Sequence, residues 1–185
     1  MRRILKIISM KTDDISSSGL NALIFLVKTV DSAKKKQNSE HSEFLISYIQ
    51  HQIDEFQFGQ EENVKVVKIY NALLDTFNKT FENKEASKIK SLMEIAWFLT
   101  EVIFKTIVLD LNQRSLLNKS RKSNIGEDTQ KKIVSFFENI TRFIEFSVNS
   151  PEAAPLNHAA ALFAKDLLAV LDRGFVMSIV KKILD

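Results

Sequence analysis

"LMEIAWFLTEVIFKTIVLDL", residues 92–111, is the stretch that decides the fold. One side of a helix over these residues would carry Leu92, Ile95, Leu99, Val102 and Ile103, and its other sides would carry Trp97, Phe98, Phe104 and Val108. A helix that is apolar on more than one side is packed on more than one side. The pattern therefore predicts a helix over residues 84–111 at the centre of the domain, with Trp97 and Phe98 in the core.

The same stretch is the nearest approach to a membrane span, but four charged residues interrupt it: Glu94, Glu101, Lys105 and Asp110. Each is costly in hydrocarbon, so we expect a helix that is buried by protein. The N-terminal run "MRRILKIISM" imitates a signal peptide, but Lys6 interrupts it and no small-residue cleavage site follows. The sequence thus predicts a soluble, cytoplasmic molecule without a transmembrane segment.

Outside this helix, the chain is poor in residues that break helices, with 4 Gly and 2 Pro among 185 residues. An all-β fold needs many turn residues, so this composition favours helices. Apolar residues recur at helical spacing in seven further segments, about 2–10, 20–31, 40–58, 62–81, 129–148, 156–172 and 175–185. Ser39 is the expected N-cap of the third segment and Gly59 its C-terminal cap. Residues 112–128 form a basic, polar loop that we expect to be flexible.

About eight successive helices predict an all-α fold, an irregular armadillo- or HEAT-like stack in which each pair of helices buries its apolar face against the next. No strict repeat is visible, and a closed bundle is the alternative. The last helix is still apolar at Ile183 and Leu184. We therefore treat 1–185 as a single segment, a fragment of a larger α-solenoid, because an open stack accommodates a cut end more easily.

Sites for chemistry are hard to find in this sequence. His41, His51 and His158 lack a second ligand at the helical spacing of a metal site, and the chain has no Cys. Neither a glycine-rich phosphate loop nor a nucleophile elbow is present. We expect no catalytic, cofactor-binding or metal-binding residues.

Acidic residues cluster mainly where helices are expected to begin, at Asp13-Asp14, Glu61-Glu62 and Glu127-Asp128. Negative charge is stabilised there by the helix dipole, which favours capping over acid–base catalysis. Glu94 and Glu101 differ, because they are seven residues apart and share one face of the central helix. They are either buried and functional or on an exposed edge, and unpaired charges usually occupy the exposed edge.

The formal net charge of +3 comes from 26 basic and 23 acidic residues that are mixed along the chain. A mixed pattern does not favour nucleic acid as a partner. The basic runs are short and dispersed, which indicates solvated surface. Residues 118–122 are the one place suited to an acidic partner.

The corner in "LLAVLDRGFVMSIV", residues 167–180, predicts the end of one helix and the start of another. Gly174 is expected in the left-handed conformation just past the first helix, with Arg173 in its last turn. Asp172 can accept hydrogen bonds from free amides of the next helix. Phe175 and Val176 then enter the core, so the corner is structural.

The segment "NHAAALFAKDLLAVLDRGFVMSIVKKIL" resembles the DOCK (dedicator of cytokinesis) family segment built on Asn-His, a Phe-containing helix and Asp-Arg-Gly-Phe-Val. The matching residues are Asn157, His158, Phe163, Asp172, Arg173, Gly174, Phe175 and Val176. Residues 92–111 are similar to the family segment in which a Trp-Phe pair opens a long apolar helix. The closer likeness is to the zizimin-type branch.

This resemblance implies the α-helical, armadillo-like region that lies between a C2-type lipid-binding region and the exchange domain of large guanine nucleotide exchange factors for Rho-family GTPases such as Rac. The nucleotide-sensing loop of the exchange domain has no counterpart here. The implied function is a non-catalytic scaffold that positions the lipid-binding and exchange domains and offers a regulatory or dimer contact. A GTPase would be reached only through the absent exchange domain, and a membrane only through the parent protein.

Two other functions are left open by the residues themselves. The chain could be an independent α-solenoid adaptor that binds a protein on one helical face. It could also be a helical enzyme, which measurable nucleotide exchange by this chain alone would support.

Overall fold

The computed structural model describes residues 1–9, 13–34, 41–53, 66–114, 116, 125–146, 150–151 and 153–184. Within these ranges every regular element is a helix, which confirms the all-α prediction. The elements are α1 (Arg2–Ile8), α2 (Asp13–Lys34), α3 (Glu43–Ser47), the π-helix η1 (Tyr48–Gln52), α5 (Val66–Glu82), α6 (Ala86–Glu94), α7 (Ala96–Gln113), α8 (Glu127–Phe146), α9 (Ala153–Val170) and α10 (Arg173–Leu184). In the described part of the chain, no helix is both long and apolar enough to cross a membrane.

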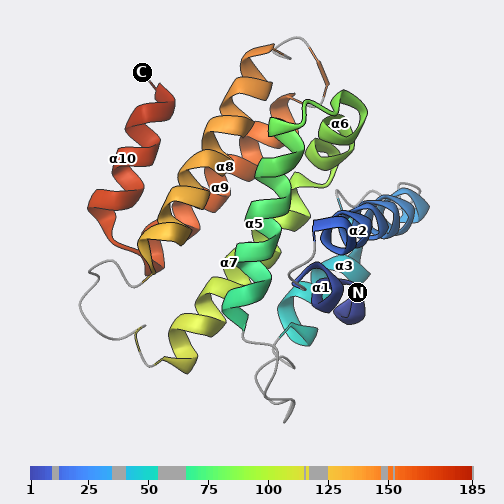
Figure 1. Ribbon diagram of the computed structural model, residues 1–185, viewed down its shortest axis with the longest axis horizontal. Helices are drawn as coiled ribbons and strands as arrows, with labels where there is room; N and C mark the ends of the chain where they lie inside the picture. The colour runs from blue at the N-terminus through green and yellow to red at the C-terminus, as the bar shows by residue number, and fades with distance from the viewer. Residues whose placement is uncertain are drawn as a thin grey trace.

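The helices pack as successive layers (Figure 1). The α1–α2 layer packs on α5, the α5–α7 layer packs on α8 and α9, and α10 packs on α8 and α9. The two ends of the chain therefore lie on opposite sides of the molecule (Figure 1). This sequential order of layers is the solenoid-like arrangement that was predicted, since each pair of helices buries its apolar face against the next.

Helix α7 lies at the centre, as its sequence predicts, and packs against both α5 and α9. Phe98 is fully buried, whereas Trp97 is only partly buried. A cluster of phenylalanines joins the neighbouring layers: the ring of Phe136 lies 4.3 Å from that of Phe77 and 5.8 Å from that of Phe163. Phe163 also stacks on Phe137, with ring centroids 5.4 Å apart. These aromatic contacts fix α9 against α8 and α8 against α5.

The prediction of one helix over residues 84–111 is wrong, because the chain breaks at Ile95 into α6 and α7. The N–H of Ile95 bonds to Leu92 O, a tighter turn than in an α-helix, and its φ and ψ are −108° and 11°. No Gly or Pro marks this position in the sequence. The cause is tertiary, because α6 packs on α2 and α5 whereas α7 packs on α5 and α9.

Two more helix starts differ from the prediction. Helix α2 begins at Asp13 instead of near residue 20, and α3 begins after Ser42 instead of Ser39. The polar run ahead of residue 20 is helical because α2 packs along α1 there: a Cβ on Gly19 would lie 2.8 Å from Ile8 Cγ1. The Gly59 cap falls within residues 54–65, outside the described ranges.

The predicted loop 112–128 is shortened at both ends, because α7 continues to Gln113 and α8 begins at Glu127. Glu127 and Asp128 stand in the first turn of α8, which confirms their predicted place at a helix start. Residues 117–124 lie outside the described ranges, so the flexibility of the loop and the role of its basic residues stay predictions.

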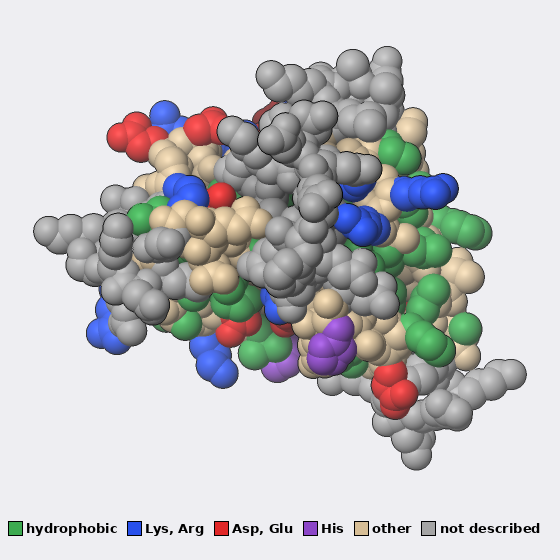
Figure 2. Space-filling view, turned by 90° about the horizontal axis from the view of Figure 1, so that it is seen from below, with side chains coloured by type: hydrophobic (Ala, Val, Ile, Leu, Met, Phe, Trp, Pro, Cys, Tyr) green, Lys and Arg blue, Asp and Glu red, His purple; other side chains and the backbone are tan. Residues whose placement is uncertain are grey.

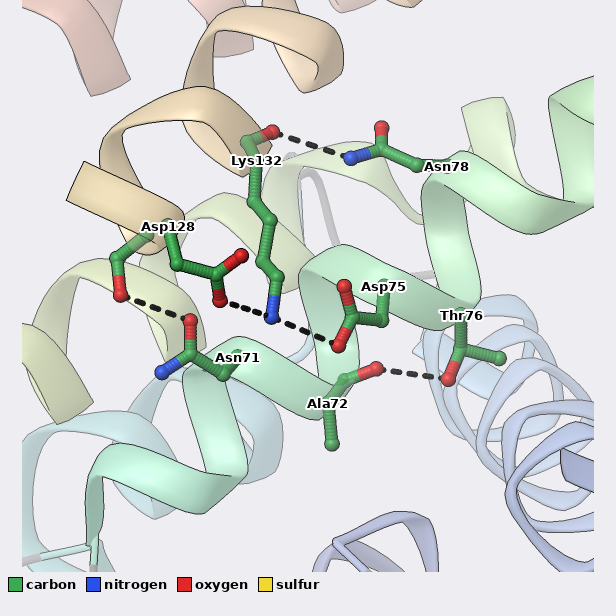
Figure 3. A network of polar contacts seen from close by, with 8 residues as sticks. Asn71, Ala72, Asp75, Thr76, Asn78, Asp128 and Lys132 are labelled. Atoms are coloured by element: carbon green, nitrogen blue, oxygen red, sulfur yellow. Dashed lines mark hydrogen bonds and ion pairs between the residues drawn. The ribbon is translucent and has the colours of Figure 1, made fainter. Parts of the chain in front are cut away.

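A polar seam joins α5 to α8 (Figure 3). Lys132 of α8 lies between Asp128 of its own helix, at 2.7 Å, and Asp75 of α5, at 3.0 Å. Asn78 donates to Lys132 O at 3.1 Å, and the Thr129 hydroxyl donates to Asn71 Oδ1 at 2.9 Å. Directional bonds of this kind fix how far one helix can slide along the other, in addition to the apolar contacts.

Candidate functional site

The corner between α9 and α10 is built differently from the prediction. Gly174 does not have a positive φ, and Arg173 is the first residue of α10 instead of belonging to the last turn of α9. Asp172 is the N-cap: its Oδ1 accepts the N–H of Phe175 at 2.8 Å, and its carbonyl accepts the N–H of Val176 at 3.1 Å. The prediction that Asp172 accepts hydrogen bonds from amides of the next helix is correct. The prediction of a left-handed conformation at Gly174 is wrong.

Gly174 has a different constraint. A Cβ at this position would lie 3.1 Å from Asp172 Oδ1, the oxygen that caps the helix. A larger side chain would therefore crowd the cap, although the backbone itself is helical and unstrained.

The family-motif residues divide into buried and exposed ones. Phe163 and Val176 are buried, and Phe175 is partly buried, so these three hold α9 and α10 in place. Asn157 and His158, in contrast, are exposed on α9. His158 lines a cavity.

This cavity, of about 730 Å³, opens between α2, α3, η1, the end of α6, α7 and α9. We call it the α7–α9 groove, and it is defined by Asp31, Ile49, Trp97, Glu101, His158 and Leu162 among its lining residues. Volumes of this size are typical of ligand sites. A π-helix, here η1, borders it, and such elements are frequent at functional sites.

Trp97 forms one wall of the groove and stacks on His41, with ring centroids 3.8 Å apart and ring planes 14° apart. The Trp97 indole Nε1 is buried and has no hydrogen-bond acceptor. Asp31 orients the segment that carries His41: Asp31 Oδ1 accepts the N–H of Ser42 at 2.8 Å, and Asp31 Oδ2 lies 3.4 Å from His41 Nδ1. This stack could not be predicted from the sequence, because His41 and Trp97 are far apart along the chain.

Glu94 and Glu101 both line the groove but differ in their partners. Glu94 is partly exposed and forms an ion pair with Lys28 of α2 at 2.5 Å, in agreement with the expected exposed edge. Glu101 is partly buried, and no basic side chain of the described residues pairs with it. Burial, and then the charge of Asp166 on α9, raise the pKa of Glu101. The exposed-edge expectation therefore holds for Glu94 and fails for Glu101.

No group of three or more His, Cys, Asp or Glu side chains that could hold a metal ion occurs in the described ranges. Lys and Arg side chains are scattered among acidic and hydrophobic ones on the face in Figure 2. Among the described residues, the α7–α9 groove brings together a cavity and a carboxylate without a basic partner.

Comparison with known proteins gives the family. The whole chain, residues 1–185, matches the family model described as DOCK6-11, TPR domain. Human Dedicator of cytokinesis protein 7 is 34% identical over 94 residues, which cover 50% of this chain and 4% of the human protein. Mouse Dedicator of cytokinesis protein 8 is 29% identical over 97 residues, which cover 50% of this chain and 5% of the mouse protein. No solved structure matches the chain.

The chain thus spans only a small part of the length of these relatives. The name of the family model, TPR, denotes a stack of paired helices, the same general architecture as the armadillo- or HEAT-like stack that the sequence predicted. The predicted DOCK family is confirmed: the chain belongs to the DOCK6-11 TPR domain family.

Proposed function

We propose that the chain is a non-catalytic helical scaffold segment of a DOCK-type guanine nucleotide exchange factor for Rho-family GTPases. The match of the family model to all of residues 1–185 carries this proposal. In the parent protein the segment lies between the lipid-binding and exchange domains, and we assign that protein to the zizimin-type branch. The parent is cytoplasmic and is recruited to membranes through its other domains.

The layered fold suits a spacer, because a stack of helices holds its two ends at a fixed separation. Both end layers also expose apolar side chains: Phe25 of α2 is 72% exposed and Met177 of α10 is 53% exposed. Neighbouring helices of the same parent protein would cover such residues. In this function the segment performs no bond chemistry and contributes only rigid packing between domains.

Nucleotide exchange is the direct test of the non-catalytic function. Release of a fluorescent GDP analogue from Rac should proceed at its spontaneous rate with the 185-residue chain and be accelerated by the longer product of the same gene. Acceleration by the chain alone, or a gene without an exchange domain downstream of residue 185, would contradict the proposal.

The scaffold function needs a second test in the longer protein, with this segment replaced by a flexible Gly-Ser linker. We expect exchange in solution to be kept and the stimulation of exchange by anionic lipid vesicles to be lost, because the linker no longer fixes the distance between the two domains. Unchanged stimulation by vesicles would show that rigid positioning is not the function of the segment.

A further inference from the structure

One carboxylate at the α7–α9 groove lacks the partner that its burial requires. Glu101 is partly buried and has no basic partner among the described residues. Trp97 lies four residues before Glu101 on α7, so both belong to one face of the helix, and both line the groove. Buried charges are normally paired, so Glu101 indicates a cationic ligand.

A second carboxylate lies near Glu101. Asp166 on the facing helix α9 is close enough to Glu101 to raise its pKa. Other acidic residues at the groove are already engaged, since Glu94 pairs with Lys28 and Asp31 binds the Ser42 amide. Glu101 is therefore the acidic position that is open to an incoming positive charge.

The remaining walls are apolar and partly open to solvent. Leu162 of α9 and Ile46 of α3 line the groove and are each 37% exposed. Burial of such surface by a ligand is favourable. The groove thus offers an apolar wall and a carboxylate that needs a cation.

We propose that the α7–α9 groove binds an arginine side chain presented by an extended segment of a partner protein. The guanidinium pairs with Glu101, and the aliphatic part of the arginine lies along the apolar wall. A peptide supplies the cation together with apolar side chains that cover Leu162 and Ile46, which a simple amine does not. Arginine suits the site better than lysine, because its planar guanidinium is more weakly hydrated and binds a carboxylate with two donors.

Trp97 is also a built-in reporter, because it is the only Trp in the chain. In the nitrogen-15 spectrum of the full chain its indole N–H gives a single peak. We would titrate the chain with the blocked peptide acetyl-Ala-Leu-Arg-Leu-Ala-amide, with the same peptide carrying citrulline or lysine in place of arginine, and with methylguanidinium.

The arginine peptide should move the indole peak saturably. The neutral citrulline peptide should bind about tenfold more weakly, since a charge-assisted bond to Glu101 is lost. The affinity of the lysine peptide should lie between those of the arginine and citrulline peptides. An indole peak that stays in place up to millimolar arginine peptide, or equal binding of the arginine and citrulline peptides, would overturn the proposal. If methylguanidinium bound as tightly as the arginine peptide, a protein segment would be ruled out as the ligand.

Glu101→Gln is the decisive variant. It should weaken binding of the arginine peptide by about tenfold and leave the affinity for the citrulline peptide unchanged. The matched control is Glu145→Gln, because Glu145 is an exposed glutamate on α8 away from the groove. If both variants lost the same affinity for the arginine peptide, or if Glu101→Gln lost none, Glu101 would not be part of the binding site. The dispersion of the spectrum confirms in each case that the variant is folded.

Discussion

Asp172 caps helix α10 by accepting the N–H of Phe175 on its Oδ1 at 2.8 Å. Residues in this position satisfy an amide that would otherwise lack a partner at the helix start. We expect Asp172→Ala to lower the free energy of unfolding by about 1 kcal/mol. Thermal or urea unfolding of the full chain measures this change.

Gly174→Ala is the informative companion to that substitution. Because Gly174 has no positive φ, alanine gains helix propensity and loses only some room beside Asp172 Oδ1, so the change should stay within about 0.5 kcal/mol. If Gly174→Ala lowered the free energy of unfolding much more than Asp172→Ala, a left-handed conformation at Gly174 would be supported and the capping role of Asp172 contradicted.

Gly19 is predicted to tolerate no side chain. An alanine Cβ would lie 2.8 Å from Ile8 Cγ1 and 3.3 Å from the Ile8 backbone nitrogen, so α1 and α2 would have to move apart. Such overpacking costs about 1–3 kcal/mol, which exceeds the gain in helix propensity. Gly126→Ala is the control, because nothing lies within 4 Å of its added Cβ. Equal melting temperatures for the two variants would exclude a close approach of α1 and α2.

Glu101→Gln should stabilise the unliganded chain at neutral pH. Burial raises the pKa of Glu101, so the folded state holds its proton at pH values where the unfolded state has released it. Stability is therefore lost as pH rises through the raised pKa, and glutamine removes this loss. The melting temperatures of the variant and the parent should coincide in acid and diverge towards neutral pH. A constant difference at every pH would refute the charge as the cause.

Tyr70→Phe tests a buried link between α5 and α7. The Tyr70 hydroxyl donates to Asp110 Oδ2 at 3.0 Å, and Arg114 donates to the same oxygen at 2.6 Å. The variant should lose about 1–2 kcal/mol of stability, because the buried Asp110 carboxylate loses a hydrogen-bond donor. In an Asp110→Asn background the same substitution should cost less. Additive costs in the double variant would show that the two residues act independently.

Local periodicity was enough to predict most of the helices and the central place of α7, and the resemblance of residues 157–176 to a family motif predicted the family. Phe98, for example, was expected in the core and is fully buried. The break at Ile95 could not be predicted, because no residue there prefers a turn and the cause is the different packing of α6 and α7. The conformation of Gly174 was not predictable for a similar reason. The residue pattern around it suits the end of one helix, but in the structure it belongs to the start of the next.

The groove could be predicted even less. Trp97 was expected in the core and Glu101 was expected on an exposed edge, and both expectations came from α7 alone. Their surroundings depend on His41, from the segment ahead of α3, and on His158, from α9. Only a long-range arrangement brings these residues to one cavity, and periodicity within one helix contains no information about it.

The sequential order of layers has a mechanical consequence. Since the α1–α2 layer packs mainly on α5, and α10 packs on α8 and α9, a pull between the two ends is transmitted through the α5–α7 layer. The layers act as springs in series, so the weakest contact between two layers sets the stiffness of the whole segment. The seam of Lys132 with Asp75 and Asp128 lies across one of these contacts. Those three side chains therefore affect how much of a displacement at one end of the stack is transmitted to the other end.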